Sequence, residues 1–271
     1  MEALPSLFAL AFAVVLAPAT RRALVSGGFV RENYRGRAVP FPFGVVIVFA
    51  AVAALVPLSL IARFSDTRAL PDELAIVVPF ALGVAFLGLA DDALSGPERG
   101  WRGHGAAVLR GGFSTGALKA VGALGLALYV APGDHGEYLL AAAVLVLATN
   151  LFNLLDLRPG RAVKVFVLLG AGLTLGAWDA RPLAALGLFA APVLVAGVPD
   201  VREQAMLGDT GSNLVGALAG LWLVLTLSTL GLAIATGVLL IVTAYGEIRS
   251  ISALIERTPP LRFIDSIGRS K

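Results

Sequence analysis

Nine long apolar segments dominate this sequence and restrict its fold more strongly than any other feature. They cover residues 3–22, 42–62, 72–90, 113–131, 137–155, 162–178, 182–198, 211–229 and 231–249. A helix needs about 20 mainly apolar residues to cross a bilayer. The pattern predicts an all-α, polytopic integral membrane protein of about nine transmembrane helices. A tight turn near Leu230-Gly231 is expected to join the last two.

The composition agrees with a lipid-facing surface and excludes several classes of function. Hydrophobic residues make up 58% of the chain and charged residues only 14%, against about 45–50% and roughly 25% in soluble domains. The net charge is +3 without one long basic run, so we expect a lipid bilayer and phosphate-bearing partners and no nucleic acid. Cysteine is absent, which excludes disulfides and thiolate chemistry.

The placement of Lys and Arg predicts the orientation. Alternate connections, with the adjoining helix ends, hold 18 of the 21 basic residues, and the other side has only Arg63, Arg68 and Arg181. Because short cytoplasmic loops carry the excess of basic residues, we expect the N-terminus outside and the C-terminus cytoplasmic. The expected location is the cytoplasmic (inner) membrane, crossed many times.

The two ends of the chain carry separate expectations. Arg21 and Arg22 follow the first apolar segment, and Glu2 precedes it, an order that favours an uncleaved helix over a signal peptide. We divide the chain into a transmembrane domain with cytoplasmic loops, residues 1–255, and a cytoplasmic tail, residues 256–271. The tail mixes apolar and basic residues. It is expected either as an interfacial helix over the cytoplasmic mouth or as a frayed terminus.

Three clusters of acidic and amide side chains lie at the predicted cytoplasmic ends of helices. Asp91-Asp92 ends the third helix, Asn150, Asn153 and Asp156 end the fifth, and Asp209 opens the eighth. At 100° per residue the three residues of the fifth helix fall within an arc of about 120°. An ionised Asp in a membrane helix costs roughly 2.5–3.5 kcal/mol, so these acids need compensation.

A shared Mg²⁺ ion would supply that compensation, since it binds carboxylate and amide oxygens together with substrate phosphates. Gly208 and Gly211, with Thr210 and Ser212, suit a phosphate close to backbone N–H groups. Simpler alternatives are a solvated Asp pair and interhelical Asn hydrogen bonds. The Gly-x-x-x-Gly patterns at 112–116 and 216–220 are interpreted as packing notches. A transporter would place its acids at mid-membrane depth, whereas these lie at helix ends.

The order of the motifs resembles the polyprenyl-phosphate N-acetylhexosamine-1-phosphate transferase superfamily, which includes phospho-N-acetylmuramoyl-pentapeptide transferase. The resemblance spans about residues 20–220, in order and on one predicted side of the membrane. The matching elements are a basic loop leading to a Pro- and Gly-containing helix start (33–44), the Asp pair (91–92), a Lys in the fourth helix (Lys119), an Asn-x-x-Asn-x-x-Asp segment (150–156) and Gly-Asp-Thr-Gly-Ser (208–212).

The resemblance implies Mg²⁺-dependent transfer of a sugar-1-phosphate from a UDP-sugar to a polyprenyl phosphate such as undecaprenyl phosphate. UMP would be released, and the product would begin a cell-envelope glycolipid. A homodimer is also considered from this resemblance. The implied roles are catalysis by Asp91, Asp92, Asp156 and Lys119, metal binding by Asp209, and substrate binding by Asn150, Asn153, Arg37, Thr210 and Ser212.

The resemblance implies that Asp91 positions or deprotonates the lipid phosphate, with support from Asp92. A phosphate monoester has a second pKa near 6, so little general-base help is needed at neutral pH. A covalent intermediate on an Asp nucleophile is an alternative.

Two departures from the family pattern affect which sugar donor is expected. Pro159 stands where members usually have another Asp, and the segment after Glu256 has no His where members carry a His-rich loop and a tenth helix. A UDP-linked sugar simpler than muramoyl-pentapeptide is therefore expected. The alternative is a non-catalytic paralogue that binds a lipid phosphate or nucleotide sugar.

Overall fold

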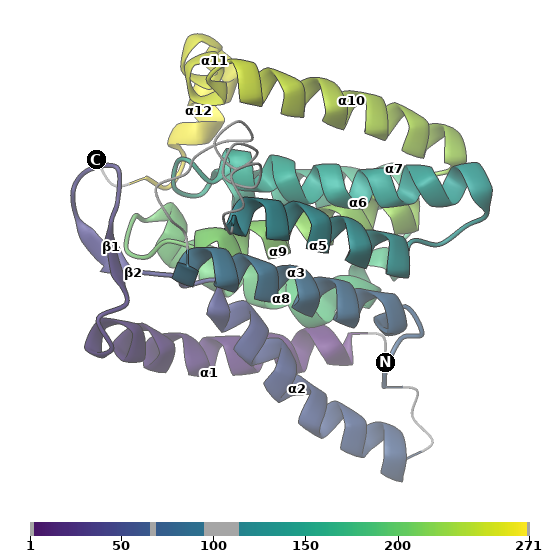
Figure 1. The fold of residues 1–271 in the computed structure, drawn as a ribbon. Helices are drawn as coiled ribbons and strands as arrows, with labels where there is room; N and C mark the ends of the chain where they lie inside the picture. Colours follow the sequence, from purple (N-terminus) through teal and green to yellow (C-terminus); the bar gives the residue numbers. More distant parts are fainter. Residues whose placement is uncertain (1–2, 66–68, 95–113, 270–271) are drawn as a thin grey trace.

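A computed structural model describes residues 3–65, 69–94 and 114–269, and in these ranges the chain is almost entirely helical. Helices occupy all nine predicted segments (Figure 1). Six of them, α1, α2, α3, α6, α8 and α10, are long and apolar enough to cross a membrane. The all-α prediction is confirmed, and the six apolar helices are compatible with a multi-pass membrane protein. The nine long helices are α1 (Leu4–Ser26), α2 (Val45–Phe64), α3 (Leu74–Leu94), α5 (Thr115–Val130), α6 (His135–Leu155), α7 (Arg161–Ala177), α8 (Arg181–Val201), α9 (Gly208–Thr226) and α10 (Thr229–Ile248).

Helix α9 lies at the centre of the bundle. It contacts α3, α6, α7 and α8, and nearly all of its residues from Thr210 to Val224 are buried. Two glycines allow the close approach to α6. A Cβ added to Gly216 would lie 2.8 Å from the Ala148 carbonyl oxygen, and one added to Gly220 would lie 3.1 Å from the Leu145 Cα. This confirms the packing-notch interpretation for residues 216–220, while Gly112 of the other pattern lies outside the described residues.

Serine side chains set where several helices begin. Ser114 accepts a hydrogen bond from the Ala117 N–H at the start of α5, and Ser228 accepts one from the Gly231 N–H at the start of α10. Such caps satisfy N–H groups that have no partner within the helix. The predicted turn at Leu230-Gly231 is therefore wrong. The chain breaks at Leu227 and Ser228, and Gly231 belongs to the first turn of α10.

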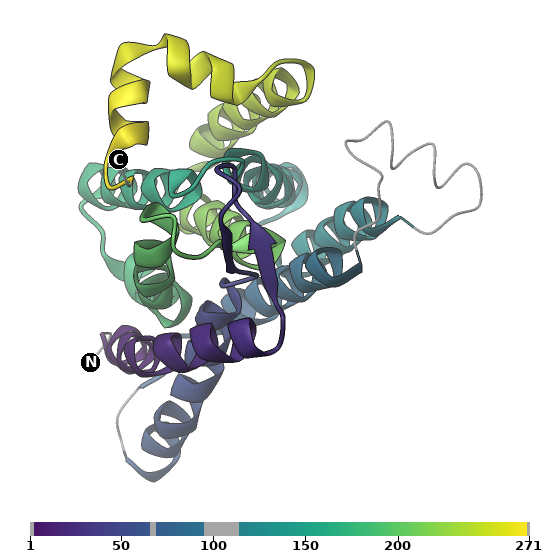
Figure 2. The same cartoon turned by 90° about the vertical axis from the view of Figure 1, so that its left-hand side faces the viewer.

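A small hairpin and two short helices gather at one end of the bundle, called here the hairpin end (Figures 1 and 2). Strands β1 (Val30–Glu32) and β2 (Ala38–Pro40) pair antiparallel. The chain after β2 is tied to the segment before α9, since the N–H groups of Phe43 and Gly44 donate to the carbonyl oxygens of Met206 and Leu207 at 2.7 and 2.9 Å. These bonds fix the start of α9 against the start of α2.

Helix α11 (Ile251–Arg257) leads into the tail and helix α12 (Pro259–Ser266) lies within it, so the frayed alternative is wrong. The buried Arg161 at the start of α7 donates through Nε and Nη2 to both carboxylate oxygens of Asp265 at 2.8 and 3.0 Å. Lys164 donates to the Asp265 carbonyl oxygen at 2.7 Å, and Arg269 donates to the Asp265 carboxylate at 2.6 Å. Burial raises the pKa of Asp265, but the Arg161 hydrogen bond and the surrounding cations outweigh it and lower the pKa below the ordinary value.

Candidate functional site

Four helices bring the predicted polar residues together at the hairpin end. Asp91 and Asp92 lie in the last turn of α3, Asn153 in the last turn of α6 and Asp209 in the first turn of α9. Lys119 extends from α5 toward the same place. These residues come from distant parts of the chain, so the tertiary fold alone makes them neighbours. The convergence of these side chains at one end of the bundle is confirmed.

Lys119 joins two of the acids. Its ammonium nitrogen donates to Asp91 Oδ2 at 2.8 Å and also forms an ion pair with Asp209 Oδ2. All three side chains are largely buried, with at most 30% of the side-chain surface exposed. A carboxylate pair so close together would repel without a cation between them. Lys119 therefore holds α3, α5 and α9 together through charge.

Asn153 extends this network to α6. With its amide oriented to satisfy both neighbours, its nitrogen donates to Asp209 Oδ1 at 3.2 Å and its oxygen accepts from Lys119 Nζ at 3.0 Å. The Ser212 hydroxyl lies 3.3 Å from the same amide group. Both carboxylate oxygens of Asp209 thus have a partner, one in Lys119 and one in Asn153.

Asp92 caps the start of α9 from a different helix. Its carboxylate accepts hydrogen bonds from the backbone N–H groups of Asp209 and Thr210 at 2.9 and 2.8 Å, and from the Thr210 hydroxyl at 2.7 Å. A negative charge at a helix N-terminus is favourable, because the first N–H groups have no partner within the helix. These N–H groups were expected to face a phosphate. That expectation is wrong for the N–H groups of Asp209 and Thr210, since Asp92 accepts their hydrogen bonds.

Glycines let the backbones meet at the site. A Cβ added to Gly88 of α3 would lie 2.3 Å from the Asp209 carbonyl oxygen, and one added to Gly44 would lie 2.3 Å from the Gly211 Cα. Such distances are impossible for a real side chain. Gly211 therefore serves helix packing rather than close approach of a phosphate.

A small polar pocket of about 190 Å³ opens beside this network. Four acids from four parts of the chain line it, namely Glu32 of β1, Asp156 after α6, Asp200 near the end of α8, and Asp209. Arg31 and Tyr34 of the hairpin line it as well. The predicted Asp156 thus shares a pocket with Asp209, although no hydrogen bond joins the two.

Two predicted binding residues are placed differently. Arg37 lies at the end of the hairpin turn with an exposed side chain and does not line the pocket, whereas Arg31 lines it and stacks on Phe41 with 3.9 Å to the ring centroid. Asn150 takes no part in the hydrogen bonds that join Lys119, Asn153 and Asp209.

Sequence reasoning missed two buried acids. Asp200 is only 2% exposed and accepts a hydrogen bond from the Gly160 N–H at 2.8 Å. Glu203 accepts from the Tyr34 hydroxyl at 2.7 Å and pairs with Arg35 at 3.1 Å. Asp200 could have been found, because it ends an apolar segment on the same predicted side as the other acids.

Within the described ranges no group of three or more acidic or histidine side chains is arranged to hold a metal ion. Comparison with protein-family models found no match, and a search of curated proteins found none either.

Proposed function

We propose that the chain is a polyprenyl-phosphate sugar-1-phosphate transferase of the cytoplasmic membrane. In this proposal all nine long helices span the bilayer, with the N-terminus outside and the hairpin end in the cytoplasm. The observation that carries it is the meeting of Asp91, Lys119, Asn153 and Asp209 from four helices beside one pocket. The distribution of basic residues supports the orientation.

The reaction would join two anions. An oxygen of the polyprenyl phosphate would attack the phosphorus that carries the sugar, the bond to UMP would break, and UMP would leave. Asp91 would position the acceptor phosphate, and Lys119 would offset its charge. Arg31 and Tyr34 at the pocket wall would contact the donor, because Arg is suited to phosphate oxygens.

The residues present are compatible with Mg²⁺. Six carboxyl groups lie in or beside the pocket against two cations, Lys119 and Arg31. The carboxyl groups are those of Glu32, Asp91, Asp92, Asp156, Asp200 and Asp209. Mg²⁺ often takes one or two protein carboxylates and completes its shell with water and substrate phosphates, so a site without three converging acids is no obstacle. Asp209 would hold the ion, which would neutralise the donor diphosphate.

One observation favours the non-catalytic alternative. Lys119 already neutralises Asp91 and Asp209 in the described structure, so the fold needs no metal there to balance these two charges. A binding protein of this kind would show thermal stabilisation by a UDP-sugar or a polyprenyl phosphate without turnover.

The test is UMP release by the purified protein with Mg²⁺, polyprenyl phosphate and a panel of UDP-sugars. At least one donor should give UMP above the rate of an Asp209→Asn variant, and magnesium chelation should abolish it. Asp134→Asn is the matched control, since Asp134 is exposed in a connection away from the site. Equal UMP release by wild type and Asp209→Asn for every donor would refute catalysis at this site.

A further inference from the structure

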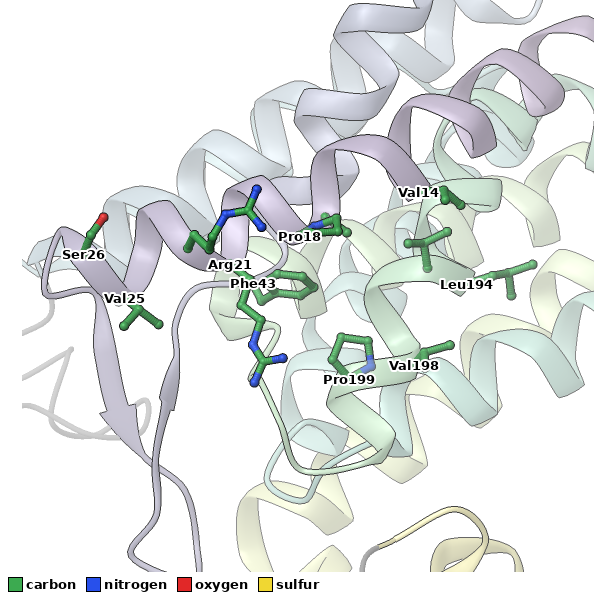
Figure 3. A pocket seen from close by; sticks show the side chains of 12 residues that line it. Val14, Pro18, Arg21, Val25, Ser26, Phe43, Leu194, Val198 and Pro199 are labelled. Carbon is green, nitrogen blue, oxygen red and sulfur yellow. The ribbon is translucent and has the colours of Figure 1, made fainter.

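A second hollow, separate from the polar pocket, lies between α1 and α8. It has a volume of about 870 Å³, within the range of small-molecule sites. Figure 3 shows side chains of α1, such as Val14 and Pro18, on one side and side chains of α8, such as Leu194 and Val198, on the other. Both helices are candidate membrane spans. We call this hollow the α1–α8 groove.

The groove is apolar along most of its length and basic at one end. Val14, Leu194 and Val198 are about half exposed, whereas Phe43 closes the groove from behind and is buried. Arg21 and Arg22 line the end nearest the hairpin. With a rise of 1.5 Å per residue, Arg21 lies about 10 Å along α1 from Val14. The two arginines are therefore separated from the apolar wall in the same way that the charged headgroup of a lipid is separated from its acyl chains.

The two arginines are free to bind an anion. In the described part of the chain neither guanidinium forms a hydrogen bond or ion pair, and both side chains are exposed. The other lining residues of the groove carry no acid that could neutralise them. A hollow with an apolar wall, two unpaired cations and one polar end fits a lipid that carries a negative headgroup.

We propose that the α1–α8 groove binds an anionic glycerophospholipid, with its phosphate at Arg21 and Arg22 and an acyl chain along Val14, Leu194 and Val198. This site is separate from the polar pocket, which is lined by different residues. It does not depend on the transferase proposal, so each proposal can fail alone. Binding there would hold α1 against α8 at the hairpin end.

The experiment is native mass spectrometry of the purified full chain, released from micelles and titrated with phosphatidylglycerol or phosphatidylcholine of the same acyl chains. Wild type should retain phosphatidylglycerol in preference to phosphatidylcholine. The Arg21→Gln/Arg22→Gln variant should bind phosphatidylglycerol about thirtyfold more weakly. That change is about 2 kcal/mol at 1.4 kcal/mol per tenfold, as expected for two basic side chains beside an anionic lipid.

The matched control is Arg249→Gln/Arg257→Gln, which removes the same charge from two exposed arginines outside the groove. Its affinity should match wild type. If both double variants lose affinity equally, or if neither does, the proposal is wrong.

A second variant tests the apolar wall without changing charge. Val198→Trp should fill the groove and displace phosphatidylglycerol, whereas Val238→Trp, at a similarly exposed position of α10, should not. Unchanged binding by Val198→Trp would overturn the proposal. So would a lipid-free dimer that Val198→Trp converts to a monomer, because the occupant would then be a second copy of the chain.

Discussion

The capping of α9 by Asp92 leads to a quantitative prediction about the free energy of unfolding. Its carboxylate accepts three hydrogen bonds, from the N–H groups of Asp209 and Thr210 and from the Thr210 hydroxyl. A hydrogen bond to a charged group contributes about 1.5–3 kcal/mol, and the three are not independent because they share one acceptor. Asp92→Ala should therefore lower the free energy of unfolding by about 4 kcal/mol.

The assay is reversible unfolding in mixed micelles at constant pH. Asp134→Ala is the control, because Asp134 precedes α6 without a side-chain hydrogen bond to that helix, and its loss should stay below about 0.5 kcal/mol. Thr210→Val removes only the hydroxyl bond and should cost about 1.5 kcal/mol. When Asp92→Ala is already present, adding Thr210→Val should not lower the free energy of unfolding any further. A loss for Asp92→Ala within about 1 kcal/mol of the control would refute the capping argument.

Three further predictions follow from the same geometry. Gly88→Ala should lower the free energy of unfolding by about 2 kcal/mol, because the added methyl group would push α3 away from α9. Gly125→Ala is the control and should be neutral or stabilising, since nothing lies within 4 Å of its added Cβ. An equal loss in both variants would contradict the contact between α3 and α9. Lys119→Met should reduce transfer at least a hundredfold and Lys119→Arg less, measured as UMP release; activity equal to wild type in both would exclude a role for the ammonium. The pKa of Asp265 lies below its ordinary value of 3.8. The contribution of Asp265 to docking the tail should therefore be constant above about pH 5 and fall as the pH drops through that lower pKa. Hydrogen exchange of α12 should show this loss of protection in wild type and not in Asp265→Asn.

Much of the fold could be predicted because membrane helices obey local rules. Apolar length located all nine long helices to within a few residues. The exception is the predicted turn near Leu230-Gly231, since the break between α9 and α10 lies at Leu227 and Ser228. Ser228 caps α10, and a cap determines where a helix begins more directly than a flexible residue nearby.

The candidate site was predictable in its members but not in its contacts. Asp91, Asn153 and Asp209 could be grouped because each lies at a helix end on one predicted side. The use of Asp92 as a cap for α9 could not be predicted, since the partners are 117 residues apart in sequence. The meeting of Gly88 with α9 is equally non-local. Asp200 was missed because a single acid beside a helix end resembles an ordinary loop residue.

The central claim is that the carboxylates at the hairpin end act on a lipid phosphate, and lipid product formation tests it most directly. The measurement is the yield of sugar-linked polyprenyl diphosphate in proteoliposomes supplied with Mg²⁺ and the donor that releases UMP. Wild type and Asp134→Asn should form the product at the same rate, and Asp91→Asn and Asp209→Asn should each form it at least a hundredfold more slowly. Product formation by either site variant at the wild-type rate would contradict the account.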